Sequence, residues 1–228
     1  MIKKLQALKA KKGFTLVELV VVIAIIGVLA AILIPVMIGV VQDANITSAD
    51  TLAKQIYSTT TTFCTNADTA KHSLRGVDKS HVAYVKAAVA GGTWTLTFGG
   101  CEAATGVTTG ATTGIDTGTT GVILKFGDGN TYKFAGTDTE KSLAGRLGDT
   151  LRDFTNGVAY IYFSNGACVG AIVEQGASST SDSMGTLKGA VAKALFPSTQ
   201  KAVGTWDGKA GVLSGGVIIG TSPKIALS

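Results

Sequence analysis

The most apolar part of the chain is an uncharged stretch of 23 residues from Leu19 to Val41. As a helix rising ~1.5 Å per residue it would be about 35 Å long, enough to cross a bilayer core about 30 Å thick. The apolar region of a secretory signal is shorter, and here Gln42 and Asp43 follow without an Ala-x-Ala cleavage pattern. The pattern therefore predicts a retained membrane-spanning helix.

Beyond Val41 the helical pattern continues on one face only. Polar side chains occupy most of the other face, so we expect one helix over residues 14–63 whose second half packs on a sheet. The β-branched run Thr59–Thr62 is expected to fray the end of this helix. The face that recurs every three or four residues consists of Ile46, Ala49, Ala53, Ile56, Thr60 and Phe63.

Residues 64–228 have the pattern of an α+β head with an antiparallel sheet. Asn165-Gly166 and the run Gly127–Asn130 are hairpin turn signals. Thr137 and Glu140 have the spacing of a capping box before a helix with a leucine stripe. Strands are expected at Thr93–Phe98, Val122–Phe126, Thr131–Ala135, Val158–Ser164, Ala167–Glu174, Val212–Ile219 and Lys224–Leu227, helices at Asp78–Ala90, Leu143–Phe154 and Ser183–Phe196, and an exposed loop at Gly106–Gly121.

The charge of the chain is concentrated at its N-terminus. The formal net charge is +5, but five lysines and no acidic residue lie within residues 1–13, and the rest of the chain has equal numbers of basic and acidic residues. The basicity is therefore no sign of nucleic-acid binding. Lysines on the N-terminal side of the apolar stretch instead orient that end toward the cytoplasm and the head toward the outside.

One acidic residue, Glu18, lies at the start of the apolar stretch. An ionised carboxylate costs roughly 2.5–3.5 kcal/mol at the centre of a membrane. Glu18 could stay hydrated at the headgroup boundary, or it could need a cation inside an apolar assembly. If the chain is cut after Gly13, the new amine of Phe14 is the nearest cation, and packed helices could pair it with a neighbour's Glu18.

The order of residues around Gly13 is distinctive. Gly13 precedes Phe14, Glu18 is the fifth residue after the glycine, and Pro35 is the twenty-second. The segment of residues 9–45 resembles the class III leader and N-terminal helix of type IV pilins and pseudopilins. This resemblance implies a pilin-like fold, with a long transmembrane and amphipathic helix packed against the sheet of the head. It also implies a leader at residues 1–13, a helix at 14–63 with its membrane-spanning part at 14–41, and an extracellular head at 64–228.

The same resemblance implies the function and the partners. A prepilin peptidase at the cytoplasmic membrane would cut after Gly13, Phe14 would be N-methylated, and Glu18 would contribute to assembly into a homo-oligomeric filament at the cell surface. The assembly machinery of the pilus would be a further partner, and adhesion or motility a role. No cofactor is implied.

Gly27 and Pro35 weaken the helix between them. Proline lacks an N–H group and clashes with a preceding carbonyl, and glycine lowers helix propensity by about 1 kcal/mol relative to alanine. These two residues predict either a simple kink or local unwinding of Val28–Ile34 in a filament.

Three cysteines, Cys64, Cys101 and Cys168, fall on the expected outer side, where oxidation is possible. Their wide spacing matches no CxxC-type metal box. Three states stay open: one disulfide with one thiol, three buried thiols, or a zinc site completed by His72 or His81.

The sequence contains no familiar catalytic motif. It lacks GxSxG, HExxH, a phosphate-binding GxxxxGK[ST] and a strand-linked GxGxxG, so we expect no enzyme. The leading hypothesis is a structural subunit of a type IV pilus. Its rivals are a pseudopilin of a type II secretion or DNA-uptake apparatus and, in a different class, a membrane-anchored extracellular binding protein or exported enzyme.

Overall fold

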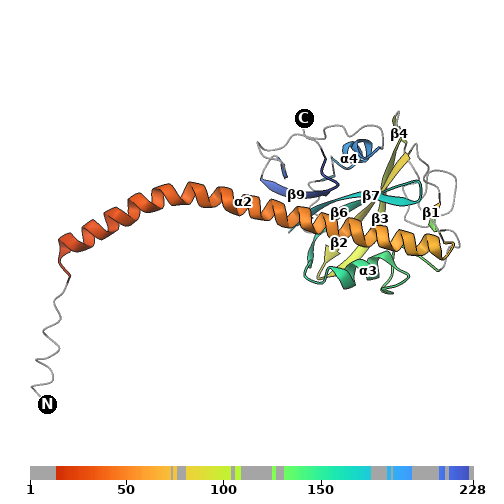
Figure 1. Cartoon of the computed structure of the whole chain (residues 1–228), viewed down its shortest axis with the longest axis horizontal. Helices are drawn as coiled ribbons and strands as arrows, with labels where there is room; N and C mark the ends of the chain where they lie inside the picture. Colours follow the sequence, from red (N-terminus) through yellow and green to blue (C-terminus); the bar gives the residue numbers. More distant parts are fainter. Residues whose placement is uncertain are drawn as a thin grey trace, which may run out of the picture. The chain divides into compact units, whose positions relative to one another are not determined.

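The computed structural model describes residues 14–72, 74–75, 81–103, 106–108, 125–126, 131–175, 184–185, 187–196, 211–213 and 216–225. The chain divides into two compact units, Met1–Ala44 and Asn45–Ser228. The first consists, as far as it is described, of the start of one helix, and the second contains the rest of that helix and the head. Figure 1 shows the order of the elements along the chain.

The long helix is α2 (Leu16–Thr69), with 54 residues. At ~1.5 Å per residue it is about 80 Å long. The prediction of one long N-terminal helix is confirmed, and the helix continues six residues past Phe63, its expected end. Pro35 lies inside it.

The run Thr59–Thr62 was expected to fray the end of the helix, but the helix continues through it. Two of its hydroxyl groups donate a hydrogen bond to the carbonyl four residues earlier: Thr61 to Tyr57 at 2.8 Å and Thr62 to Ser58 at 2.9 Å. Thr65 continues the series with a bond of 3.0 Å to Thr61. These bonds satisfy three threonine hydroxyl groups within the helical geometry, and the helix continues through the run to Thr69.

The head is built on a seven-stranded sheet with the order β4-β3-β2-β6-β7-β9-β8, in which every pair is antiparallel. A two-stranded antiparallel sheet pairs β1 with β5. The expected antiparallel α+β head is therefore confirmed. The strands are β1 (Leu74–Arg75), β2 (His81–Ala90), β3 (Thr93–Ala103), β4 (Gly106–Thr108), β5 (Lys125–Phe126), β6 (Asn156–Ser164), β7 (Ala167–Gln175), β8 (Val212–Leu213) and β9 (Val217–Ser222).

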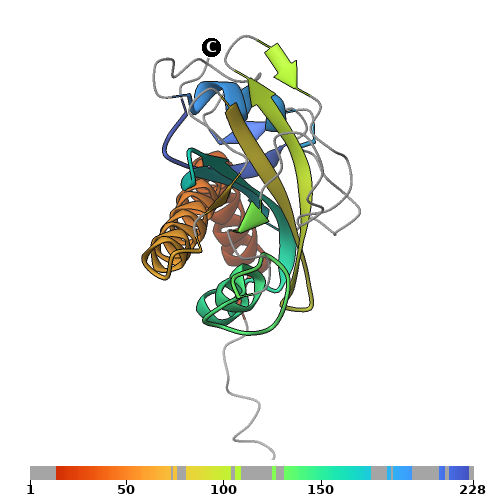
Figure 2. The same ribbon diagram turned by 90° about the vertical axis from the view of Figure 1, so that its right-hand side faces the viewer.

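The two faces of the large sheet bury separate apolar clusters. Because side chains alternate along a strand, Ile161 and Phe163 of β6 face one way and Tyr160 and Tyr162 face the other. The first cluster contains the buried face of α2 from Leu52 onward and of α3 (Leu143–Thr150). The second contains α4 (Lys188–Ala194) and parts of β8 and β9. Figure 2 shows α2 and α4 against the curved sheet.

Two strand predictions are confirmed directly. The Asn165-Gly166 turn joins β6 to β7, and both residues have the positive φ values, 50° and 80°, that a two-residue hairpin turn requires. The alternation at Thr93–Phe98 forms the first part of β3, with Trp94 and Leu96 buried. The expected strand at Val212–Ile219 is divided into β8 and β9.

Other predictions are wrong. Asp78–Ala90 is not a helix, since its described part from His81 forms β2, whose burial on both faces removes the polar alternation of a surface strand. Thr131–Ala135 is not a strand, and Lys125–Phe126 pairs with β1. Lys224 and Ile225, at the start of another expected strand, are not in a strand. The Gly127–Asn130 turn lies outside the described residues, as does most of the Gly106–Gly121 loop, of which Gly106–Thr108 forms β4.

The helix with the leucine stripe begins later than the capping-box pattern predicts. Its N-cap is Ser142, whose hydroxyl accepts a hydrogen bond from the Gly145 N–H at 3.0 Å. Asp138 instead closes the preceding turn, accepting the N–H groups of Glu140 and Lys141 at 2.8 and 3.1 Å. These bonds lower the pKa of Asp138. The helix α4 also begins later than the expected Ser183.

Candidate functional site

The first candidate site is the start of α2, which a capping box forms. The backbone N–H and the hydroxyl of Thr15 both donate to Glu18 Oε2 at 2.8 Å, and the Glu18 N–H donates to Thr15 Oγ1 at 3.2 Å. The box satisfies backbone donors that have no partner within the helix and places a negative charge at its positive end. The T-x-x-E spacing of Thr15 and Glu18 could have identified this role from the sequence.

Phe14 immediately precedes this box and is 86% exposed. Gly13, on the other side of the expected cleavage site, lies outside the described residues. The amine of Phe14 exists only after cleavage, so the pairing of that amine with Glu18 stays a prediction. In the uncut chain the carboxylate of Glu18 is bonded to Thr15.

The helix that follows is covered with exposed apolar side chains. From Leu16 to Val41 the large apolar residues are between 47% and 79% exposed. Among the described helices, α2 is the one long and apolar enough to span a membrane. A continuous apolar surface of this extent needs a bilayer or other apolar helices around it, because single soluble proteins expose contiguous apolar patches of only a few hundred Å².

Gly27 and Pro35 both lie inside α2, which continues through them. A Cβ atom at Gly27 would have nothing within 4 Å, so packing inside the chain does not require glycine there. Pro35 removes one backbone hydrogen bond from the helix. The predicted unwinding of the segment between them concerns the filament and stays a prediction.

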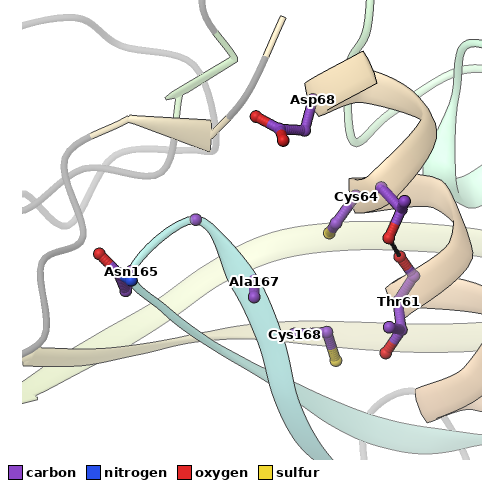
Figure 3. Close-up of a pocket in the computed structure, with 8 residues that line it drawn as sticks. Thr61, Cys64, Asp68, Asn165, Ala167 and Cys168 are labelled. Atoms are coloured by element: carbon purple, nitrogen blue, oxygen red, sulfur yellow. Dashed lines mark hydrogen bonds between the residues drawn. The ribbon is translucent and has the colours of Figure 1, made fainter.

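The second candidate site contains two of the three cysteines. Cys64 lies on α2 and Cys168 near the start of β7, and together they line a cavity of about 300 Å³ (Figure 3). Cys101 lies on β3, and all three are buried thiols. Burial raises the pKa of Cys64 to about 12 and that of Cys168 well above its usual value.

Of the three cysteine states left open by the sequence, the zinc site finds no group of ligands among the described residues. Within the described ranges no three His, Cys, Asp or Glu side chains are grouped to hold a metal ion. The ring of His72 lies 5.6 Å from that of Tyr132, and the carbonyl of His81 accepts a hydrogen bond from Ser164 Oγ. These contacts are with Tyr132 and Ser164, and neither involves a cysteine.

The charged residues of α3 and of the turn after it make contacts within the head. Arg152 pairs with Asp149. Arg146 Nε donates to the Thr139 carbonyl at 3.1 Å, and its guanidinium lies 5.6 Å from the centre of the Phe63 ring. These contacts join α3 to the preceding turn and to α2, which is a structural role.

Comparison with known proteins adds to this description. Residues 8–34 match the family described as "Prokaryotic N-terminal methylation motif". Over 86 residues the chain is 40% identical to a fimbrial protein of Moraxella nonliquefaciens, a region that covers 36% of this chain and 56% of that protein. Together these matches indicate a type IV pilin. The matched region spans about half the length of that relative, and no solved structure matches the chain.

The type IV pilin motif coincides with the first candidate site. The matched segment contains Gly13, Phe14, Glu18 and Gly27, and Pro35 follows it directly. Type IV pilins are a structural family not known for enzymatic activity, which agrees with the lack of a catalytic motif in the sequence.

Proposed function

We propose that the chain is the structural subunit of a type IV pilus, made as a membrane-anchored precursor and assembled through its N-terminal helix into an extracellular filament. The observation that carries this proposal is the exposed apolar surface of α2 from Leu16 to Val41, which begins directly after the Gly13-Phe14 pair of the methylation motif. This surface suits a bilayer before assembly and a bundle of identical helices after it.

The precursor has three parts in this proposal. Residues 1–13 are a leader whose lysines keep that end in the cytoplasm until a prepilin peptidase cuts after Gly13. Residues 14–41 hold the precursor in the membrane and later form the core of the filament, with Phe14 methylated at its amine. The remainder of α2 carries the head, which lies outside the cell and forms the coat.

Glu18 has two roles in this proposal. Within its own helix it completes the capping box, where Thr15 uses only Oε2 of the carboxylate. A carboxylate has about four lone-pair sites, so the same side chain can also accept a hydrogen bond from the Phe14 amine of a neighbouring subunit. Neutralising both charges inside an apolar core favours addition of a subunit in one register and penalises addition one turn away.

Two substitutions separate these roles. Glu18→Gln keeps a side chain that suits the capping box but removes the charge, whereas Thr15→Val removes the hydroxyl and keeps the charge. We expect Glu18→Gln to reduce the yield of sheared filaments at least ~10-fold, since a lost charge pair worth 1.4 kcal/mol already gives that factor. Thr15→Val should assemble nearly as the unaltered chain does. Immunoblots of membranes and of sheared surface material measure both.

The controls decide between this function and its rivals. The Glu18→Gln chain must still be processed and inserted, which its size and its membrane fraction report. Normal filaments from Glu18→Gln would contradict the charge role. An unaltered chain that is processed but absent from sheared filaments would favour a pseudopilin, and an uncut chain would favour a membrane-anchored binding protein.

The segment Val28–Ile34 is proposed to unwind in the filament. Gly27 and Pro35 mark its ends, and the space around Gly27 would let a neighbouring helix approach closely. A filament map in which α2 stays continuous through this segment would contradict the unwinding without affecting the rest of the proposal.

A further inference from the structure

Cys64 and Cys168 come from distant parts of the chain and meet between α2 and the β6–β7 hairpin. The Cys64 thiol lies beside the backbone N–H group of Cys168, and both cysteines line one cavity together with Thr61, one turn earlier on α2. The Cys168 thiol donates a weak hydrogen bond to the Gly170 carbonyl at 3.7 Å. Figure 3 shows both sulfur atoms in the space between the helix and the hairpin. The two thiols therefore lie in one cavity although 104 residues separate them in sequence.

The sheet register excludes Cys101 from this pair. Cys101 lies opposite Ala83, which lies opposite Phe163, which lies opposite Cys168, so three strand spacings separate the two cysteines. At about 4.8 Å each, these spacings total about 14 Å, whereas the Cα atoms of a disulfide lie about 4.4–6.8 Å apart. Because Cys64 lines the same cavity as Cys168 and its thiol lies beside the backbone of β7, a similar separation keeps Cys101 from Cys64.

We propose that Cys64 and Cys168 are the two ends of a disulfide that joins α2 to β7, and that Cys101 remains a thiol. The Cys64 thiol lies beside the backbone N–H group of Cys168, and in this proposal rotation of the two side chains about χ1 brings their sulfur atoms together. The adjoining cavity of about 300 Å³ leaves room for that rotation.

The oxidation is a balanced exchange with a disulfide oxidant, such as oxidised glutathione or an oxidoreductase carrying an active disulfide. One thiol loses its proton and attacks the oxidant, giving a mixed disulfide and releasing one reduced thiol. The second thiolate then attacks the protein sulfur of that mixed disulfide, forms the Cys64–Cys168 bond and releases the other reduced thiol. Two electrons and two protons pass to the oxidant.

Burial determines when this exchange takes place. The thiolate is the attacking species, and the raised pKa values of Cys64 and Cys168 keep the folded, reduced pair almost fully protonated. The bond therefore forms while the head folds, before α2 covers β7. Once formed, it lies in the apolar cluster between α2 and the sheet, which shields it from reductants.

The bond would keep the head attached to α2 when the filament is pulled. The contacts between helix and sheet are otherwise non-covalent among the described residues. A covalent link from the middle of the sheet to the helix would hold even if the hairpin opened locally. This consequence depends on the proposed filament, whereas the pairing itself does not.

The test uses the full chain in two settings. Cells are lysed under denaturing conditions with a thiol-alkylating reagent, and separately the detergent-solubilised chain is reduced, unfolded and refolded with oxidised glutathione. Mass spectrometry of protease digests then locates the linked and the alkylated cysteines. We expect a linked pair of peptides containing Cys64 and Cys168, two hydrogens lighter than the separate peptides, with alkylation at Cys101 alone.

Variants identify the partners. Cys101→Ser should retain the link, and Cys64→Ser and Cys168→Ser should each abolish it. Refolded protein with three alkylated cysteines, or with a link through Cys101, would overturn the proposal. A Cys64–Cys168 link that forms on refolding but not in cells would support the pairing and contradict the extracellular placement of the head.

Discussion

The backbone of β9 at Gly220 packs directly against the backbone of α2, and replacing this glycine tests how that contact stabilises the head. A Cβ atom at this position would fall on the carbonyl group of Ala49 and 2.6 Å from the backbone nitrogen of Asp50. Both belong to the backbone of α2, so no side-chain rotation can relieve the clash. Gly220→Ala must therefore move β9 away from α2.

The loss of unfolding free energy in Gly220→Ala has two causes. Overpacking of this kind costs about 1–3 kcal/mol. The movement also breaks the bond from the Thr221 N–H to Asp50 Oδ1, which is 3.0 Å long and partly buried. Hydrogen bonds to charged groups contribute about 1.5–3 kcal/mol. We therefore expect Gly220→Ala to lower the free energy of unfolding by roughly 3 kcal/mol or more.

Urea unfolding of the full chain in a mild detergent, followed by tryptophan fluorescence, measures this loss. Gly148→Ala in α3 is the matched control, since its Cβ would meet Trp94 Cδ1 at 3.4 Å and the Gly92 carbonyl oxygen at 3.9 Å, both at ordinary contact distance. Alanine in a helix gains up to about 1 kcal/mol over glycine, so the control should be neutral or stabilising. A Gly220→Ala loss below about 1 kcal/mol would refute the reasoning that the close approach of β9 to α2 supports the head.

Three further predictions concern the head. Ser142→Ala should lower the free energy of unfolding by about 1–2 kcal/mol in the same urea assay, because the N-cap of α3 is lost. The pKa of Asp138 in the folded chain is below its unfolded value of about 3.9. The carboxylate therefore contributes fully to stability above about pH 4, and this contribution is lost as the pH falls through the folded pKa. Asp138→Asn should flatten the acid side of a plot of unfolding free energy against pH. Reducing a Cys64–Cys168 disulfide, which closes a loop of about 100 residues, should lower the free energy of unfolding by up to about 4.7 kcal/mol, whereas a reductant should leave the Cys64→Ser variant unchanged.

The long N-terminal helix could be predicted from the sequence because the patterns that indicate it are local. A long apolar stretch followed by a one-sided periodicity gives one helix, and α2 extends that helix only as far as Thr69. The Asn165-Gly166 turn is equally local, since two adjacent residues with positive φ determine the hairpin.

The secondary-structure predictions were wrong where residues distant in sequence determine the local structure. The segment that forms β2 contains four alanines, which favour a helix by propensity, and it lacks the alternation of apolar and polar residues that marks a surface strand. It is a strand because β3 and β6 pair with its two edges and apolar clusters cover both its faces. Likewise β5 pairs with β1, about fifty residues earlier, which no local turn signal reveals.

One candidate site could be predicted from local sequence, and the other depends on the fold. Gly13, Phe14 and Glu18 lie within six consecutive residues, so their motif can be recognised without a structure. The pairing of Cys64 with Cys168 cannot, because it depends on the order of strands in the sheet and on which face of α2 lies against β7. Three cysteines permit three pairings, and only the register of four strands removes two of them.

The N-terminus of the mature protein tests the central claim most directly. Filaments sheared from the cell surface are purified, and their main protein is examined by N-terminal sequencing and intact mass. A type IV pilus subunit must begin at Phe14, carry one methyl group on its amine and lack residues 1–13. A chain that still begins at Met1, or the absence of this chain from surface filaments, would contradict the account.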